Sequence, residues 1–200
     1  MSDLLILVTA CLLGSIPFGY LLVKWVKGVD IRTQGSGNIG MTNVWRVAGA
    51  GWGIATLALD IAKGVLAVWL AAHFDPEDDW LRVACGLAAL LGNVFSIFLK
   101  FKGGKGIGVS TGVFFYLLPV PSSAGLGAFI LAVLLTRMIS VGSLLGVSVM
   151  MALTFYFQKT LNWYSGLALF ATVMIWWTHR QNIQRILNGT ENKIGKKKAK

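Results

Sequence analysis

Long apolar segments separated by short polar ones dominate this sequence. Apolar residues make up 56% of the 200-residue chain and charged residues only 13%, which is about half of the charged fraction of an ordinary soluble domain. A helix needs about 20 predominantly apolar residues to cross the hydrocarbon core of a bilayer. The predicted membrane helices are residues 4–26, 52–72, 80–99, 104–118, 121–136, 141–157 and 163–178. We therefore expect an all-α, polytopic membrane protein with seven transmembrane helices, some of them short or broken.

Prolines interrupt two of these segments. Pro17 predicts a bend in the first segment, because proline removes a backbone donor and clashes with the preceding turn. The run PVPSS at residues 119–123 predicts two short helices in the region 104–136, and one long kinked helix is the alternative. The first segment has no basic residues before it and no small-residue cleavage site, so we expect a retained span and not a signal peptide.

Basic residues favour seven spans over six. With the N-terminus outside and the C-terminus cytoplasmic, fifteen of the eighteen basic residues lie on the inner side, the exceptions being Lys63, Arg82 and Lys159. Six spans would move Arg137 and the basic C-terminus to the opposite side. The net charge of +10 indicates anionic lipids and anionic substrates, and not nucleic acid, as partners. We expect one transmembrane domain over residues 1–200, with residues 193–200 as a basic, disordered tail.

Residues 35–46, GSGNIGMTNVWR, form the first polar stretch on the inner side. The glycines, including Gly37, allow a ligand to approach the backbone closely. Neutral hydrogen-bonding groups and one arginine, which carries charged donors suited to phosphate, accompany them. The candidate ligands are Ser36, Asn38, Thr42, Asn43 and Arg46. A flexible inter-helix loop is the alternative. The string G-x-G-x-x-G is not a dinucleotide motif here, because it follows a membrane span and not a β-strand.

Residues 100–108, KFKGGKGIG, form the second polar stretch. They are not a P-loop, because Gly106 and not Ser or Thr follows Lys105. The backbone N–H groups of Gly103 and Gly104, the Lys105 ammonium and the following helix N-terminus still suit a phosphate. The alternative is a set of lysines that only orient the protein in the membrane, beside a glycine turn.

Two further features carry polar groups. His179 and Asn182 are three residues apart and share one face if the segment is helical. His179 is a candidate general base or hydrogen-bond donor, and an interfacial histidine without a role is the alternative. Asp60 and Lys63 form an i, i+3 pair inside a span, where charges are costly and usually paired. We expect a structural ion pair facing the helix bundle, or a supporting role that orients Lys105 or Arg46.

Five sequence blocks complete the pattern. They are GSGNIGMTN from Gly35, LDIAKG from Leu59, FKGGKG from Phe101, RMIS from Arg137 and HRQNIQR from His179. With these blocks in this order, the chain resembles the bacterial acyl-phosphate:glycerol-3-phosphate acyltransferase family over nearly its whole length. The resemblance implies a seven-helix enzyme of the bacterial inner membrane, with its active site on the cytoplasmic face.

The resemblance also implies a reaction. The family transfers a fatty acyl group from acyl phosphate to the sn-1 hydroxyl of glycerol 3-phosphate, giving lysophosphatidic acid and inorganic phosphate as the first step of phospholipid biosynthesis. No metal or cofactor is expected, acyl-CoA is not the donor, and an upstream enzyme that makes acyl phosphate is the expected functional partner. Carried over by motif, the polar groups of the pocket are Ser36, Arg46, Lys105, Ser140, His179 and Asn182.

The sequence departs from the family before the lysine loop. The family commonly reads Gly-His-x-x-Pro there, whereas this chain has Asn93 and Ser96 at the His and Pro positions. Because asparagine is no base, any role of that histidine is lost or reduced to hydrogen bonding. With Ser96 in place of proline, we expect a different local helix bend. Met41 also replaces a usual alanine.

The chemistry leaves two candidates for the base. Arg46 and Lys105 would offset the repulsion between two phosphates, and orientation of the reactants would supply much of the catalysis. The acceptor proton goes to His179 or to the donor phosphate, and we favour the donor phosphate, with His179 and Ser36 positioning the acceptor. A covalent role for Ser36 is least favoured, because no acidic residue orients a triad. The alternative functions are a transporter of a phosphorylated solute and a non-catalytic lipid-binding protein.

Overall fold

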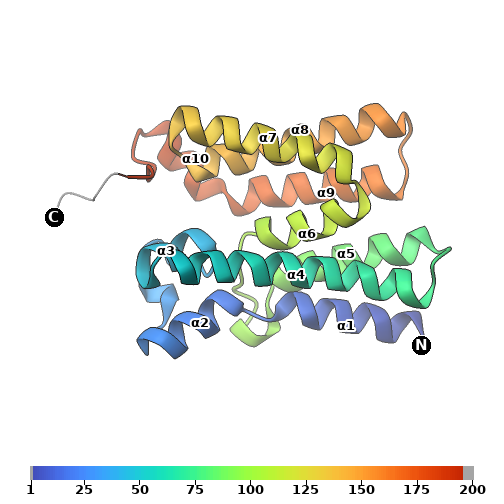
Figure 1. Ribbon diagram of the computed structural model, residues 1–200, viewed down its shortest axis with the longest axis horizontal. Coiled ribbons are helices and arrows are strands. Elements are labelled where there is room, and N and C mark those ends of the chain that lie inside the picture. The colour runs from blue at the N-terminus through green and yellow to red at the C-terminus, as the bar shows by residue number, and fades with distance from the viewer. Residues whose placement is uncertain (1, 196–200) are drawn as a thin grey trace. The chain divides into compact units, whose positions relative to one another are not determined.

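The protein is described by a computed structural model that covers residues 2–195, and every regular element in that range is helical (Figure 1). The chain divides into two compact units, residues 1–117 and residues 118–200, and each is described by itself. The predicted disordered tail lies mostly outside the described residues, which end at Gly195.

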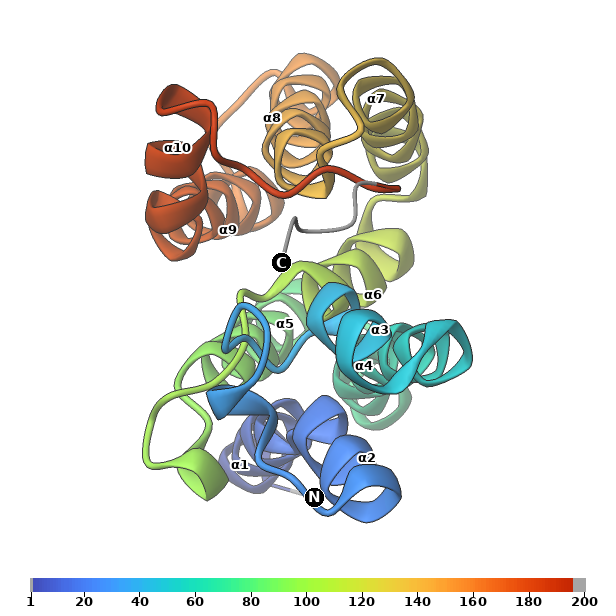
Figure 2. The same ribbon diagram turned by 90° about the vertical axis from the view of Figure 1, so that its left-hand side faces the viewer.

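Unit 1 is organised around one long helix. Its elements are α1 (Asp3–Ser15), α2 (Phe18–Lys27), η1 (Ile31–Thr33), α3 (Met41–Ala48), α4 (Ala50–Phe74), α5 (Asp79–Val94), η2 (Ile97–Leu99) and α6 (Ile107–Leu117). Helix α4 packs against α1, α2, α3, α5 and α6 (Figure 2). A polar side chain on the packed face of α4 can therefore contact several neighbouring helices.

The bend expected at Pro17 is confirmed. Helix α1 ends at Ser15 and α2 begins at Phe18, so Ile16 and Pro17 separate two helices that together form one apolar segment of 25 residues. Because proline has no N–H, the helical hydrogen-bond ladder stops there. The break leaves the Ile16 carbonyl available to partners outside its own helix.

Unit 2 consists of α7 (Pro119–Thr136), α8 (Ile139–Gln158), α9 (Trp163–Thr178) and α10 (Arg180–Leu187). Helix α8 packs against α7 and α9 (Figures 1 and 2). Small residues allow α7 and α8 to approach closely: a Cβ added at Gly125 would lie 2.7 Å from the Gly146 carbonyl oxygen. Such contacts between small residues are typical of membrane helices, which gain little from burying apolar surface.

Five helical segments are long and apolar enough to cross a membrane, counting only the described residues. They are Asp3–Lys27, Ala50–Phe74, Asp79–Leu99, Pro119–Thr136 and Ile139–Gln158. Helix α6 is apolar but has only 11 residues. The all-α fold is therefore confirmed for the described residues, the five segments agree with the predicted membrane protein, and the number of seven spans stays a prediction.

The two-helix interpretation of residues 104–136 is confirmed, and one long kinked helix is wrong. Helix α6 ends at Leu117 and α7 begins at Pro119. Between them Leu118 has φ −139° and ψ 64°, outside the helical region. The physical cause is Pro119, which disfavours a helical conformation in the preceding residue and starts a helix well because the first helical N–H needs no partner.

The alternative of a flexible inter-helix loop over residues 35–46 is wrong in its second half, because α3 begins at Met41. Gly40 precedes the helix with extended dihedral angles. The side chains of Val44, Val47 and Ala48 recur at helical spacing and pack on one apolar cluster. This burial decides the conformation of a segment whose composition resembles a loop.

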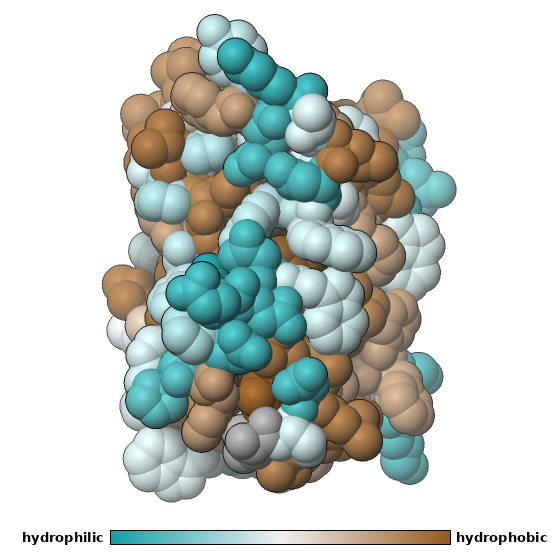
Figure 3. All heavy atoms as spheres, turned by 90° about the vertical axis from the view of Figure 1, so that its right-hand side faces the viewer, coloured by the Kyte–Doolittle hydropathy of each residue, from teal (hydrophilic) through white to brown (hydrophobic). Residues whose placement is uncertain are grey.

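Charge is separated along α4 in unit 1. The turn after α4 carries Asp75, Glu77 and Asp78, Asp79 begins α5, and hydrophilic side chains gather at this end of the unit (Figure 3). The other end of α4 follows Arg46 and the glycine-rich segment before it. The separation agrees with the side assigned to each segment by the positive-inside rule.

Candidate functional site

Asn43 organises the loop at residues 35–40. Its side chain is buried, its Oδ1 accepts a hydrogen bond from the Ser36 N–H at 2.8 Å, and its Nδ2 donates to the carbonyls of Gln34 and Asn38, both at 2.9 Å. A third carbonyl, that of Ile31, lies 3.4 Å away. The side-chain amide of Asn43 therefore bonds within the protein, and it shapes the loop that carries the candidate ligands Ser36 and Asn38.

Two glycines in this loop adopt conformations that favour glycine. Gly35 has φ +61° and Gly37 has φ +73°. A Cβ at Gly35 would collide with Asn43 Oδ1, and one at Gly37 would lie 3.1 Å from the Arg32 carbonyl oxygen. Glycine at positions 35 and 37 therefore allows the loop to turn closely around the Asn43 side-chain amide.

The remaining candidates in this stretch lie around the same loop. Asn38 Oδ1 accepts a hydrogen bond from the Gly40 N–H at 2.8 Å, just before α3 begins. Ser36 and Arg46 are exposed, and Thr42 is partly buried in the first turn of α3. Ser36 and Arg46 are thus the exposed candidates of this segment, whereas Asn43 is buried.

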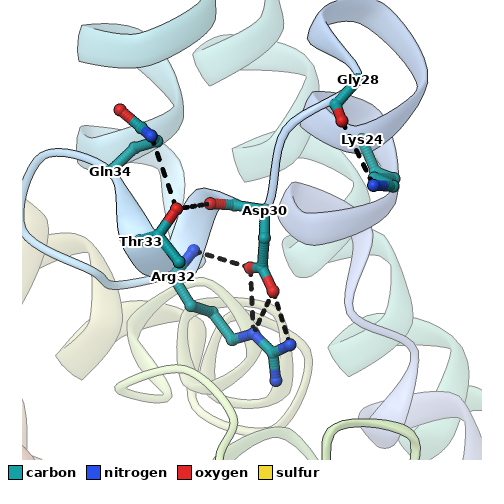
Figure 4. A network of polar contacts seen from close by, with 6 residues as sticks. All are labelled: Lys24, Gly28, Asp30, Arg32, Thr33 and Gln34. Carbon is teal, nitrogen blue, oxygen red and sulfur yellow. Dashed lines mark hydrogen bonds and ion pairs between the residues drawn. The ribbon is translucent and has the colours of Figure 1, made fainter.

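A second arginine nearby, Arg32, forms an ion pair with a carboxylate (Figure 4). The Arg32 guanidinium contacts Asp30 through its Nη2 at 2.6 Å and its Nε at 3.0 Å, and the Arg32 N–H bonds the same carboxylate. These hydrogen bonds lower the pKa of the Asp30 carboxyl to about 2. Arg32 thus closes the turn that leads into the loop, and its charge is largely neutralised by Asp30.

The second glycine loop is attached to the end of α5. The N–H of Gly103 donates to the Val94 carbonyl at 3.0 Å and that of Gly104 to the Asn93 carbonyl at 2.9 Å. These two N–H groups, which we predicted to cradle a phosphate, therefore hold the loop in place. Phosphate contacts from this segment are expected instead from Lys105, which is partly buried, and from the first turn of α6.

Packing brings the two polar stretches of unit 1 together. Ile39, from the first loop, and Leu99, from η2 before the second, belong to one buried cluster with Val23, Ile31 and Val44. A Cβ added at Gly104 would lie 3.6 Å from Ile39 Cγ1. The stretch with Ser36 and Arg46 and the stretch with Lys105 are thus neighbours in one unit.

The ion pair predicted in α4 is confirmed. Lys63 Nζ lies 2.9 Å from Asp60 Oδ1, and the Lys63 side chain is only 3% exposed. The same ammonium donates to Asn93 Oδ1 at 2.9 Å and to the Ile16 carbonyl at 2.8 Å. Asn93 therefore acts as a hydrogen-bond acceptor, and Ser96 donates to the Ser15 carbonyl at 2.6 Å.

His179 lies at the junction of α9 and α10 in unit 2. Its ring is buried, and Nδ1 is 2.8 Å from the Ile175 carbonyl oxygen. Since a carbonyl only accepts hydrogen bonds, we assign the proton to Nδ1, and Nε2 carries the lone pair in the neutral ring. Arg180, by contrast, lies over the Trp177 ring at 4.7 Å.

Ser140 and Asn182 meet at a carboxylate that the sequence did not indicate. Ser140 Oγ and Asn182 Nδ2 donate to Glu191 Oε1 at 2.9 and 2.8 Å, and Arg185 Nε donates to Oε2 at 2.7 Å. The Glu191 side chain is 5% exposed. Burial raises the pKa of the Glu191 carboxyl, but the hydrogen bonds from Asn182, Arg185 and Ser140 outweigh burial and leave that pKa below its usual range.

Glu191 was missed because its partners are distant in the sequence. The sequence offered one signal for Glu191: it is the last acidic residue of the chain and lies within a basic C-terminal segment. A second contact fixes the same segment, because the Ile194 N–H donates to the Arg137 carbonyl at 2.8 Å. The predicted ligands Ser140 and Asn182 are therefore held by the segment that follows α10.

Comparisons with known proteins show the family of this chain. A family model described as glycerol-3-phosphate acyltransferase matches residues 4–189. A glycerol-3-phosphate acyltransferase of Halalkalibacterium halodurans is 40% identical over 198 residues, covering 97% of this chain and 96% of the relative. One from Trichlorobacter lovleyi is 44% identical over 188 residues, covering 92% of this chain and 94% of the relative.

Solved structures show the same fold. A crystal structure of PlsY, an integral membrane glycerol 3-phosphate acyltransferase, in its glycerol 3-phosphate form superposes with a TM-score of 0.91 at 34% identity, covering 98% of this chain and 96% of that one. The lysophosphatidic acid form of that protein gives a TM-score of 0.88 at 33% identity, with the same coverage.

Proposed function

The chain belongs to the glycerol-3-phosphate acyltransferase family, and from this premise we propose its acyl donor, the residues that contact its substrates and its orientation in the membrane. It is an integral membrane enzyme that transfers an acyl group to glycerol 3-phosphate, with lysophosphatidic acid as the product. The donor that we propose is acyl phosphate, which places the reaction first in phospholipid biosynthesis.

The proposal for phosphate binding rests on the two neighbouring polar stretches of unit 1. Two phosphate groups, one on each substrate, repel one another unless cations offset their charge. Arg46 and Lys105 supply that charge from segments that pack through Ile39 and Gly104. Ser36 and Thr42 add hydroxyl donors, while Asn38, Asn43, Gly37, Gly103 and Gly104 shape the two loops.

The reaction needs no metal or cofactor, because acyl phosphate is already activated. The sn-1 hydroxyl oxygen attacks the acyl carbonyl carbon, the bond from that carbon to the phosphate oxygen breaks, and inorganic phosphate leaves. The hydroxyl proton goes to the departing phosphate in the substrate-assisted route that we favour. His179, through Nε2, is the alternative base. Ser140 and Asn182 are the other proposed substrate contacts, on the strength of their motifs.

The proposed orientation has seven spans, with the N-terminus outside and the C-terminus and active site on the cytoplasmic face of the bacterial inner membrane. The acidic α4–α5 turn and the basic polar stretches at opposite ends of α4 support it. An upstream enzyme that makes acyl phosphate is the proposed functional partner. Membrane lipids surround the protein, and the apolar acyl chain stays among them.

A transporter of a phosphorylated solute has less support. Such a protein needs polar groups along a path through the membrane. Asp60 and Lys63 were the charged pair well inside the predicted spans, and they bind one another. Family membership and this pairing both favour the enzyme.

One assay tests the donor. Purified protein in detergent is given palmitoyl phosphate and labelled glycerol 3-phosphate, and in parallel palmitoyl-CoA in place of palmitoyl phosphate. We expect labelled lysophosphatidic acid only with the acyl phosphate. Comparable rates with both donors would contradict the proposed donor, and no product with either would contradict the proposed activity.

A further inference from the structure

The Lys63 ammonium lies where four segments of unit 1 meet. Its three protons face three acceptors: Asp60 Oδ1 at 2.9 Å on α4, Asn93 Oδ1 at 2.9 Å on α5, and the Ile16 carbonyl at 2.8 Å between α1 and α2. The Phe18 ring lies 5.7 Å away. An ammonium group has three donors and no acceptor, so this site matches its full bonding capacity.

Burying the Lys63–Asp60 ion pair has an energetic cost, so its presence needs a physical explanation. A buried ion pair loses the hydration of both charges, and replacing it with apolar residues is often neutral or stabilising. The remaining bonds to Asn93 and Ile16 lower that cost without removing it. Stability alone is thus a weak explanation for Lys63, and the residues that it contacts indicate another.

Asn93 connects Lys63 to the second glycine loop. The side-chain oxygen of Asn93 binds Lys63, and its backbone carbonyl accepts the N–H of Gly104 at 2.9 Å. A Cβ at Gly103 would collide with that same carbonyl, and one at Gly104 would lie 3.2 Å from Asn93 Nδ2. The loop therefore packs directly against Asn93, whose side chain is held by Lys63.

Asp60 contacts the other end of the same loop. A Cβ added at Gly108 would lie 2.6 Å from Asp60 Cβ, so the first turn of α6 rests on this residue. Lys105 stands between the two contacts, with Gly104 on one side and Gly108 on the other. One ion pair on α4 therefore adjoins both ends of the short segment that carries the phosphate-binding lysine.

We propose that Lys63, Asp60 and Asn93 are positioning residues that set the path of the loop 103–108 and so the place of the Lys105 ammonium against a phosphate dianion. This inference rests on the proposed function, in which Lys105 binds phosphate. It also assigns Asn93 a role as acceptor, at a position where the family commonly has histidine. The phosphate belongs to glycerol 3-phosphate or to the acyl donor, and the chemistry of recognition is the same for both.

Asn93→Leu is the decisive variant, because it keeps the side-chain size and the ion pair but removes the acceptor. We expect KM for at least one phosphate substrate to rise about tenfold, the order of one charge-assisted hydrogen bond, with kcat changed less than about threefold. The substrate whose KM rises identifies the phosphate at the loop. Asn93→Asp keeps an oxygen at the same position and is expected to restore KM.

The matched control is Arg82→Met, which removes another i, i+3 ion pair of unit 1, between Arg82 and Asp79. That pair lies at the opposite end of α5 from Asn93. We expect both KM values to stay unchanged in this variant, whatever its melting temperature. Asn93→Gln, which shifts the amide by one methylene, replaces Asn93→Leu if that variant does not accumulate.

Two measurements separate this inference from the proposed function. Melting temperatures in detergent report stability, and their dependence on glycerol 3-phosphate or palmitoyl phosphate concentration gives a Kd without turnover. Weaker binding in Asn93→Leu supports positioning. A lower melting temperature with unchanged KM and Kd would overturn it and leave a structural role only. A wild-type protein without product formation would contradict the proposed function, and the Kd values would still decide this inference.

Discussion

Ser140 and Glu191, 51 residues apart in the sequence, are joined by a hydrogen bond of 2.9 Å from the serine hydroxyl to the buried carboxylate. The same oxygen accepts from Asn182, and Arg185 pairs with the other oxygen. One carboxylate therefore fixes two of the proposed substrate contacts and closes the C-terminal segment onto α8 and α10.

Glu191→Ala is expected to destabilise the protein by about 2–4 kcal/mol, because three charge-assisted hydrogen bonds are lost and the Ser140 and Asn182 donors lose a shared acceptor. Melting in detergent measures the loss. Glu77→Ala, at an exposed residue of the α4–α5 turn, is the control and is expected to melt with the wild type. Equal melting temperatures for the Glu191→Ala and Glu77→Ala variants would contradict the assignment.

The same carboxylate predicts a dependence on pH. Its pKa is lower in the folded protein, so its stabilisation is fully present above the unfolded pKa of about 4.3 and is lost as pH falls through the folded pKa. We expect the gap in melting temperature between wild type and Glu191→Gln to be constant from pH 8 to pH 6 and to shrink below about pH 4.3. A gap that widens on acidification has the wrong sign for this account.

Gly35→Ala tests the path of the first loop. The substitution meets both φ +61° and the Asn43 side-chain oxygen, so we expect lower activity and a loss of about 1–3 kcal/mol. Gly51→Ala is the matched control, because a Cβ there meets no atom within 4 Å in α4, and helix propensity predicts a gain of up to about 1 kcal/mol. Similar effects of the two substitutions on activity would argue against a functional role for the loop.

Arg46 and Lys105 are expected to differ from Arg32 in activity assays. Arg46→Ala and Lys105→Ala each remove a cation that we propose as a phosphate contact, and we expect kcat/KM to fall about 10- to 100-fold. Arg32→Ala removes a cation already paired with Asp30 on the surface, so its kcat/KM should stay within about threefold. A larger loss in the Arg32 variant than in the other two would reverse the assignment of phosphate ligands.

His179→Ala distinguishes the two candidate bases. A general base contributes about 10²- to 10⁴-fold, whereas in the substrate-assisted route the donor phosphate takes the proton. We therefore expect kcat to fall by less than about 100-fold, with the shape of the pH–rate profile retained. A larger fall, together with loss of a titrating limb in the profile, would identify His179 as the base.

Several features of the fold could be predicted from the sequence. The break at Pro17, the division between α6 and α7 at Pro119 and the Asp60–Lys63 pair all depend on local chemistry: a missing N–H, or two charges one helical turn apart. The helix α3 was missed, since its polar composition hid the apolar spacing of Val44, Val47 and Ala48.

Other features depended on contacts between distant segments. In the sequence, Ser36, Asn43 and Arg46 were all candidates as ligands. In the structure, Asn43 bonds within the loop, while Ser36 and Arg46 are exposed. The N–H groups of Gly103 and Gly104 looked suited to an anion, yet they bind carbonyls at the end of α5.

The sequence by itself determined where the chain is apolar, where its helices break, and which stretches between the helices are polar and rich in glycine, because hydropathy, proline and glycine act within a few residues of one another. Only the tertiary structure decided which of those polar groups hold the protein together, as Asn43, Asn93 and Glu191 do, and which face outward. The physical reason is that a buried donor or acceptor must find a partner, and packing, not sequence distance, determines which partner lies within 3 Å.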